Sequence, residues 1–202
     1  MNQLKSRDLK GGDILLKLND GSLTNKLIAL GQRGELNAQI VHGGIMFDSN
    51  IIIESSGPGL IANDIRVQNK AKGYIVYRPT NNNLATGAAT CAKMMFDIQG
   101  KNNSLKYNLI GTVKTKFGET GNAKSANEMD ELCQRILTGK NTPMFCTQFV
   151  VYVFQWVASQ SGISANSIFS INDAKATPSR LASILQGNSS FYEAGYMIGG
   201  ER

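Results

Sequence analysis

The sequence predicts a single α+β domain spanning residues 1–202, with strands gathered early in the chain and helices later. Three observations lead to this fold class. The length fits one domain, and apolar residues make up 42% of the chain, enough for a hydrophobic core. Short β-rich runs precede Asn81–Asn83, whereas longer segments with helical spacing follow. No repeat or low-complexity linker divides the sequence.

The first eighty residues contain short apolar runs that are typical of strands. A turn signal at Gly11–Asp13 opens the series, and the expected strands are residues 14–16, 39–47, 50–55 and 74–77, with an extra strand near 65–67. One short helix over residues 26–30 interrupts them. Ser22 or Thr24 is its expected N-cap, and Gly31 or Gly34 its expected end.

The rest of the chain favours helices, expected over residues 84–98, 107–117, 126–137, 145–159 and 179–185, followed by a last strand at 191–198. Thr177 is the expected N-cap of the final helix, since Pro178 follows it. Segment 145–159 is the most apolar of the chain. Its length and Gly162 at its end favour a buried helix, although its Val, Tyr and Phe content leaves a strand open.

Charge and hydropathy exclude several classes of protein. The net charge is +6, but the basic residues are scattered and no nucleic-acid motif accompanies them, so we expect a solvated basic face and no nucleic-acid partner. No apolar run approaches the roughly 18 residues of a membrane span, so no integral membrane segment is expected. The N-terminus lacks the apolar stretch of a secretory signal, which predicts a protein that begins in the cytoplasm.

The three cysteines, Cys91, Cys133 and Cys146, lack the CxxC spacing of zinc sites, so neither a metal nor a disulfide framework is expected. Cys91 and Cys133 lie among apolar residues of expected helices and read as small buried side chains. Cys146 differs because it opens the long apolar helix. The positive end of a helix dipole lowers the pKa of a thiol and favours the thiolate.

His42 is the only histidine, and it precedes two glycines inside an expected strand. Glycines there indicate that another part of the molecule approaches the backbone closely. If the hairpin turn is centred on Ser49, Gly44 lies opposite Glu54, and His42 is then diagonal to Glu54 on the same face. A two-residue turn would instead place Glu54 on the other face. Glu54 could also be an exposed residue at a strand end, and His42 an ordinary structural residue.

Five motifs in the order GDILL, HGGI, IIIESS, YN and FCTQFVVY resemble the circularly permuted branch of the NlpC-type, papain-like cysteine peptidase superfamily, with its YiiX-like and lecithin–retinol acyltransferase relatives. The resemblance implies an antiparallel sheet or small barrel packed against a helical layer that carries the nucleophile. It implies Cys146 as nucleophile, His42 as base and Glu54 as the residue that orients the imidazole.

The same resemblance suggests the remaining site residues. Tyr107 matches a tyrosine that precedes a helix in many YiiX-like sequences, and it is a candidate for substrate or oxyanion contact together with Thr147. Asp13 is expected to be structural, because a GD turn begins the first sheet strand in this family. Gln148 stands where the family usually has a glutamate, and this departure leaves the substrate class open.

The expected activity is hydrolysis of an amide by a cysteine enzyme that needs no cofactor and acts on peptides of the bacterial cell wall. A protein made in the cytoplasm can reach wall peptides if it is an antibacterial effector that is exported to a target periplasm without a signal peptide. Such an effector would have an immunity protein as partner. Two alternatives stay open. One is an acyltransferase or lipid hydrolase with the same thioester chemistry, and the other is a non-catalytic binding module.

Overall fold

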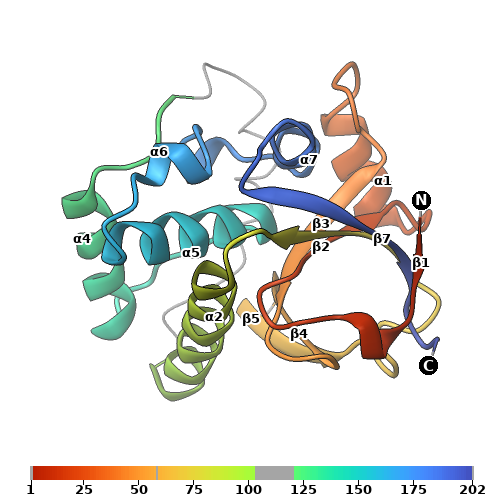
Figure 1. Cartoon of the computed structure of the whole chain (residues 1–202), viewed down its shortest axis with the longest axis horizontal. Helices are drawn as coiled ribbons and strands as arrows, with labels where there is room; N and C mark the ends of the chain where they lie inside the picture. The colour runs from red at the N-terminus through yellow and green to blue at the C-terminus, as the bar shows by residue number, and fades with distance from the viewer. Residues whose placement is uncertain (1, 58, 103–120, 202) are drawn as a thin grey trace.

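The computed structural model describes residues 2–57, 59–102 and 121–201. It contains one curled sheet with helices gathered against it (Figure 1), which confirms the α+β class. The strands follow the order β1 (Gln3–Leu4), β7 (Phe191–Ile198), β6 (Gly73–Pro79), β2 (Ile14–Leu18), β3 (Ile40–Met46), β4 (Ile51–Ser56), β5 (Gly59–Asp64).

The sheet is mixed, because β1 runs parallel to β7 while every other recorded pair is antiparallel. It does not close: β1 and β5 end the strand order and form no ladder with each other in the described parts of the chain. The expected small barrel is therefore wrong, whereas the expected antiparallel arrangement describes all but one strand pair.

The described α-helices are α1 (Leu23–Gly31), α2 (Asn82–Asn102), α4 (Ala126–Leu137), α5 (Cys146–Gln160), α6 (Ala165–Ile168) and α7 (Pro178–Gln186). Two 3₁₀ turns, Ser6–Asp8 and Asp173–Lys175, complete the set. Ser22 caps α1, and Thr177 caps α7 ahead of a proline at the first helical position, as predicted. The predicted helix over 107–117 lies outside the described residues. Between residues 2 and 201, leaving out 58 and 103–120, no helix is long and apolar enough to cross a membrane.

Strand β5 is not where the sequence predicted it. The expected strand near residues 65–67 is wrong, since these residues form a turn and the strand spans Gly59–Asp64. The reason is the tight return of the chain after β4. Ser56 pairs directly with Gly59, so only two residues separate β4 from its partner strand.

The hairpin of β3 and β4 has the register that a turn centred on Ser49 predicts. Gly44 pairs with Glu54 and Met46 pairs with Ile52. The ladder ends at the Gly44–Glu54 pair, although β3 begins earlier in the chain and β4 continues beyond it. The two strands therefore part on the side of the hairpin where His42 lies.

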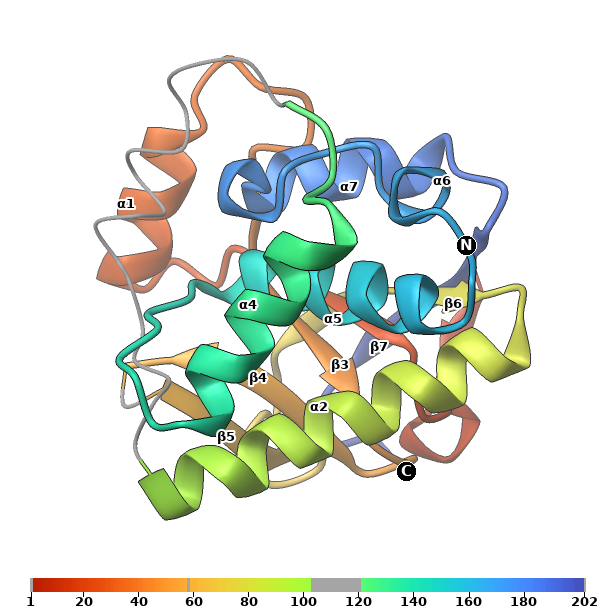
Figure 2. The ribbon, with the colours of Figure 1, turned by 90° about the vertical axis from the view of Figure 1, so that its left-hand side faces the viewer.

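The sheet has two differently covered faces. Ile14 and Leu16 of β2 belong to the large core shared with α2, α5 and α7, whereas Leu15 packs with Tyr74 and Val76 on the other face, inside the curl. Helix α5 is the centre of the large core, and Figure 2 shows it behind α4, with α2 and α7 to either side. Eleven of its fifteen residues are buried, as expected for a largely apolar helix inside a core.

Helix α5 packs on β3 at a glycine. A Cβ atom added at Gly43 would lie 3.1 Å from the methyl group of Thr147 and 3.8 Å from a methyl group of Val150. The close approach expected of the two glycines is therefore confirmed at Gly43, where the helix is the neighbour. This contact sets the first turn of α5 next to His42.

Asp13 has the structural role that the GD turn suggested. Its carboxylate is fully buried and accepts two hydrogen bonds from the guanidinium of Arg78 on β6, at 2.7 and 2.6 Å. It also accepts the backbone N–H of Lys10 at 2.9 Å. These contacts join the start of β2 to β6.

A valine at Gly43 tests the packing of α5 on β3. We expect Gly43→Val to lower the free energy of unfolding by about 1–3 kcal/mol, because the added methyl groups overlap Thr147. The control is Gly31→Val, where an added Cβ meets no atom within 4 Å and a change within about 0.5 kcal/mol is expected. Urea denaturation measures both, and equal stabilities would contradict the close packing.

Candidate active site

Three side chains that are distant in the sequence meet where β3 and β4 part. His42 and Glu54 come from neighbouring strands and lie on the inner face of the curl. Cys146 is the first residue of α5, which lies on the opposite face. The imidazole lies close enough to the sulfur to interact with it electrostatically, and its Nε2 meets the carboxylate, so the three groups follow one another from thiol to carboxylate.

The imidazole is fixed by the carboxylate. Nε2 of His42 lies 2.9 Å from Oε2 of Glu54, which leaves Nδ1 as the ring nitrogen for the sulfur. Both side chains are shielded from water, with 15% of His42 and 6% of Glu54 exposed. The arrangement matches the diagonal cross-strand pairing predicted from the hairpin register.

Two asparagines hold the carboxylate from its other oxygen. Asn63 of β5 donates a hydrogen bond to Oε1 of Glu54 at 2.8 Å, and the fully buried Asn69 donates to the same oxygen at 3.4 Å. Burial disfavours the charge of Glu54, but the nearby His42 and these amide donors outweigh it and lower the pKa of the carboxyl. His42, Asn63 and Asn69 therefore stabilise the ionised form of Glu54.

Cys146 is fully buried, and burial alone would raise the pKa of its thiol. The positive field and hydrogen bond of His42 act against burial, as do the backbone N–H groups of Gly43 and Thr147, and together they lower that pKa. Burial likewise opposes the charge of His42, but the thiolate and Glu54 raise the pKa of the imidazole. The site therefore favours a thiolate–imidazolium pair.

The segment before Cys146 is tied to the sheet. The hydroxyl of Ser55, a buried residue of β4, donates a hydrogen bond of 2.8 Å to the carbonyl of Met144. Ser55 follows Glu54 directly, so one strand positions both the carboxylate and the entry to α5. Sequence reasoning did not single out Ser55, Asn63 or Asn69.

The other site residues predicted from the sequence have different outcomes. The Thr147 hydroxyl donates to the Ala176 carbonyl in a fully buried position, so its contribution to the site is its backbone N–H. Tyr107 lies outside the described residues. Gln148 donates a hydrogen bond of 3.0 Å to the buried carboxylate of Asp173, away from the sulfur.

The remaining cysteines are not arranged like Cys146. Cys91 and Cys133 are free thiols on α2 and α4, and burial raises the pKa of both, that of Cys91 to about 12. In the part of the chain that the structure describes, no group of three or more His, Cys, Asp or Glu side chains is placed to hold a metal ion.

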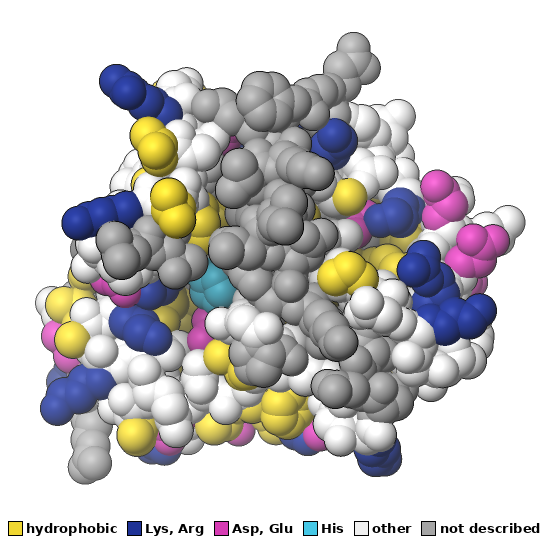
Figure 3. Space-filling view, turned by 180° about the vertical axis from the view of Figure 1, so that it is seen from behind, with side chains coloured by type: hydrophobic (Ala, Val, Ile, Leu, Met, Phe, Trp, Pro, Cys, Tyr) yellow, Lys and Arg dark blue, Asp and Glu magenta, His cyan; other side chains and the backbone are white. Residues whose placement is uncertain are grey.

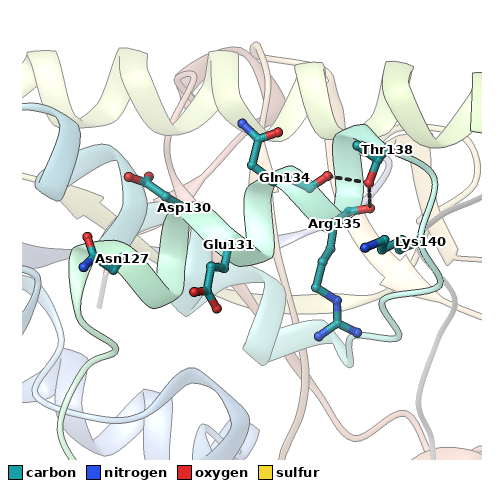
Figure 4. A pocket seen from close by; sticks show the side chains of 7 residues that line it. All are labelled: Asn127, Asp130, Glu131, Gln134, Arg135, Thr138 and Lys140. Carbon is teal, nitrogen blue, oxygen red and sulfur yellow. Dashed lines mark hydrogen bonds between the residues drawn. The ribbon is translucent and has the colours of Figure 1, made fainter.

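A cavity of about 370 Å³ lies beside His42 and Glu54. The histidine ring is visible from this side of the molecule, with basic and acidic side chains near it (Figure 3). A second hollow of about 640 Å³ follows α4 and is lined by polar side chains such as Asp130, Glu131 and Arg135 (Figure 4). These are surface residues of one helix and the loop after it, without a nucleophile, so the first cavity is the better candidate site.

Comparison with known proteins gives no independent assignment, because no protein-family model matches the chain and no curated protein is similar to it.

Alkylation by iodoacetamide tests the state of the thiol. At pH 6–7 we expect Cys146 to react at least about tenfold faster than Cys91 or Cys133, because only its pKa is lowered. Peptide mapping by mass spectrometry assigns the label to each cysteine. In urea the three thiols should react alike, and equal rates in the native protein would contradict the ion pair.

The pH dependence of this reaction tests Glu54. The rate in the native protein should rise through the lowered pKa of Cys146 and stay flat until His42 loses its proton at the upper, raised pKa. In Glu54→Gln the imidazolium is less stable, so the rising limb should move to higher pH and the rate at pH 6 should fall about tenfold. Asp97→Asn removes an exposed carboxylate and serves as control. Identical pH profiles for Glu54→Gln and native protein would exclude the positioning of His42 by Glu54.

Proposed function

We propose that the chain is a cysteine-dependent amide hydrolase in which Cys146 is the nucleophile, His42 the general acid and base, and Glu54 the residue that orients and stabilises the imidazolium. The observation that carries the proposal is that the His42 imidazole, hydrogen-bonded to Glu54, lies beside the buried thiol at the start of α5. A structural histidine would need neither a buried carboxylate held by two amides nor a thiol at a helix N-terminus.

The proposed reaction has two halves. The thiolate of Cys146 attacks the carbonyl carbon and forms a C–S bond, while the carbonyl oxygen takes the negative charge. When this intermediate collapses, the C–N bond breaks and His42 gives its proton to the leaving amine. His42 then takes a proton from water, the hydroxide attacks the thioester, and the C–S bond breaks. The acid leaves, and the thiolate–imidazolium pair is restored.

Backbone N–H groups supply the donors for the negative oxygen. Those of Gly43 and Thr147 already lie close to the sulfur, where the carbonyl carbon would bind. Both belong to rigid elements, and the positive end of α5 adds a favourable field there. Main-chain donors of this kind do not depend on the Thr147 hydroxyl, which bonds to the Ala176 carbonyl.

As substrate we propose peptides of the bacterial cell wall. The motif order that resembles permuted NlpC-type enzymes supports this class, and the net charge of +6 suits an anionic wall polymer. The open cavity beside His42 gives a peptide side chain a place next to the reacting atoms. Action on the wall requires the protein to leave the cytoplasm in which it is made, as an exported effector would.

Incubation with purified wall peptides tests the proposal. We expect hydrolysis with release of a new amine, and a loss of at least about a thousandfold in Cys146→Ser and in His42→Ala. The variant Cys133→Ser, which changes a half-buried thiol of α4 outside the site, should retain native turnover. Mass spectrometry of parallel incubations with phospholipid identifies acyl transfer or lipid hydrolysis if that is the activity. Full turnover by the Cys146→Ser and His42→Ala variants would overturn the assignment of the site.

A further inference from the structure

The cavity beside the proposed catalytic residues is lined by amide, apolar and charged side chains. Asn25 and Asn63 present amides to it, and Ile28 and Ile61 give it apolar walls. Lys17 and Lys72 also line it, together with His42 and Glu54. Four lining side chains carry charge or can carry it, so the balance between them decides which ligand fits.

Three of these four charges are compensated. Glu54 pairs with His42 at 2.9 Å. Lys17 is the cross-strand partner of His42 in the β2–β3 ladder, and its Nζ lies 2.6 Å from a carboxylate oxygen of Asp20. Each of these ions therefore has a counter-ion within the protein.

Lys72 is different because its partner is neutral. Its Nζ donates a hydrogen bond of 2.9 Å to Oδ1 of Asn69, and no carboxylate of the described residues forms an ion pair with it. The only carboxylate that lines the cavity, Glu54, is engaged by His42 and two amides. The cavity thus holds one cation without a counter-ion, next to amide donors.

We propose that this cavity is a subsite for a carboxylate of the substrate, and that Lys72 supplies the charge that recognises it. The inference rests on the proposed function, since it assigns a specificity to that active site. Asn25 and Asn63 each donate one amide N–H to a carboxylate of the protein, Asp20 and Glu54, and the second N–H of each amide is a neutral donor for the ligand. A carboxylate bound there lies beside the reacting bond. A wall peptide with a free acidic group is then favoured over its amidated form.

Lys72 also has a second effect that the test must separate. By donating to Oδ1 of Asn69 it directs the amide nitrogen of Asn69 toward Glu54. Removing Lys72 can therefore change the reactivity of Cys146 toward every reagent. A ratio of two reagents that differ only in charge cancels this common change.

The experiment compares alkylation of Cys146 by iodoacetate, an anion, with alkylation by the neutral iodoacetamide. We expect the iodoacetate-to-iodoacetamide rate ratio to fall about two- to fivefold in Lys72→Met at low ionic strength, with the difference shrinking in 0.5 M salt. Lys70→Met removes an equal charge from an exposed lysine outside the cavity and should leave the ratio unchanged. An unchanged ratio in Lys72→Met, or an equal fall in Lys70→Met, would overturn the subsite.

The substrate arm uses two wall peptides that differ only in one carboxylate, free in one and amidated in the other. The native protein should show the higher kcat/KM for the free carboxylate, and Lys72→Met should lose that preference by a similar factor. Equal use of both peptides by the native protein would reject the subsite while leaving the hydrolase intact. Slow, unselective labelling of Cys146 would instead reject the proposed function itself, so the two failures are distinguishable.

Discussion

The site depends on one structural constraint, the parting of β3 and β4 beyond the Gly44–Glu54 pair. The helical layer and the inner face of the curled sheet are otherwise separated by continuous strands. Where the ladder ends, the first residue of α5 can reach an imidazole that stands on the other face. Gly43 contributes to this arrangement in two ways. It has no side chain to keep α5 away from β3, and its backbone N–H is directed to the sulfur.

Burial gives these contacts their chemical strength. Charges in a water-poor environment interact more strongly, and an unpaired charge there is costly. The thiolate of Cys146 and the carboxylate of Glu54 are therefore both stabilised by the imidazolium of His42 between them. Asn63, Asn69 and Lys72 extend the series outward from Glu54 to the cavity wall. In this arrangement the groups that position the imidazole and the group proposed to recognise the substrate belong to one hydrogen-bonded network.

Much of this could be predicted from the sequence. A hairpin turn centred on Ser49 fixed the register, and register fixed the pairing of His42 with Glu54. The supports from Asn63 and Asn69 were not foreseen, because the glycine–proline turn signal at residues 57–59 was interpreted as a loop leading to a strand near 65–67, whereas β5 already begins at Gly59. With that strand placed at residues 65–67, Asn63 could not be aligned opposite β4. That the sheet stays open could likewise not be predicted from local patterns, which do not specify whether its two edge strands pair.

The most direct measurement is an NMR titration of the histidine ring, because the chain has a single histidine and its signal is unambiguous. The account predicts that His42 titrates well above the ordinary value of about 6.5, and that both Cys146→Ala and Glu54→Gln move its midpoint downward. A midpoint at or below the ordinary value in the native protein, unmoved by Cys146→Ala, would contradict the thiolate–imidazolium pair on which the account rests.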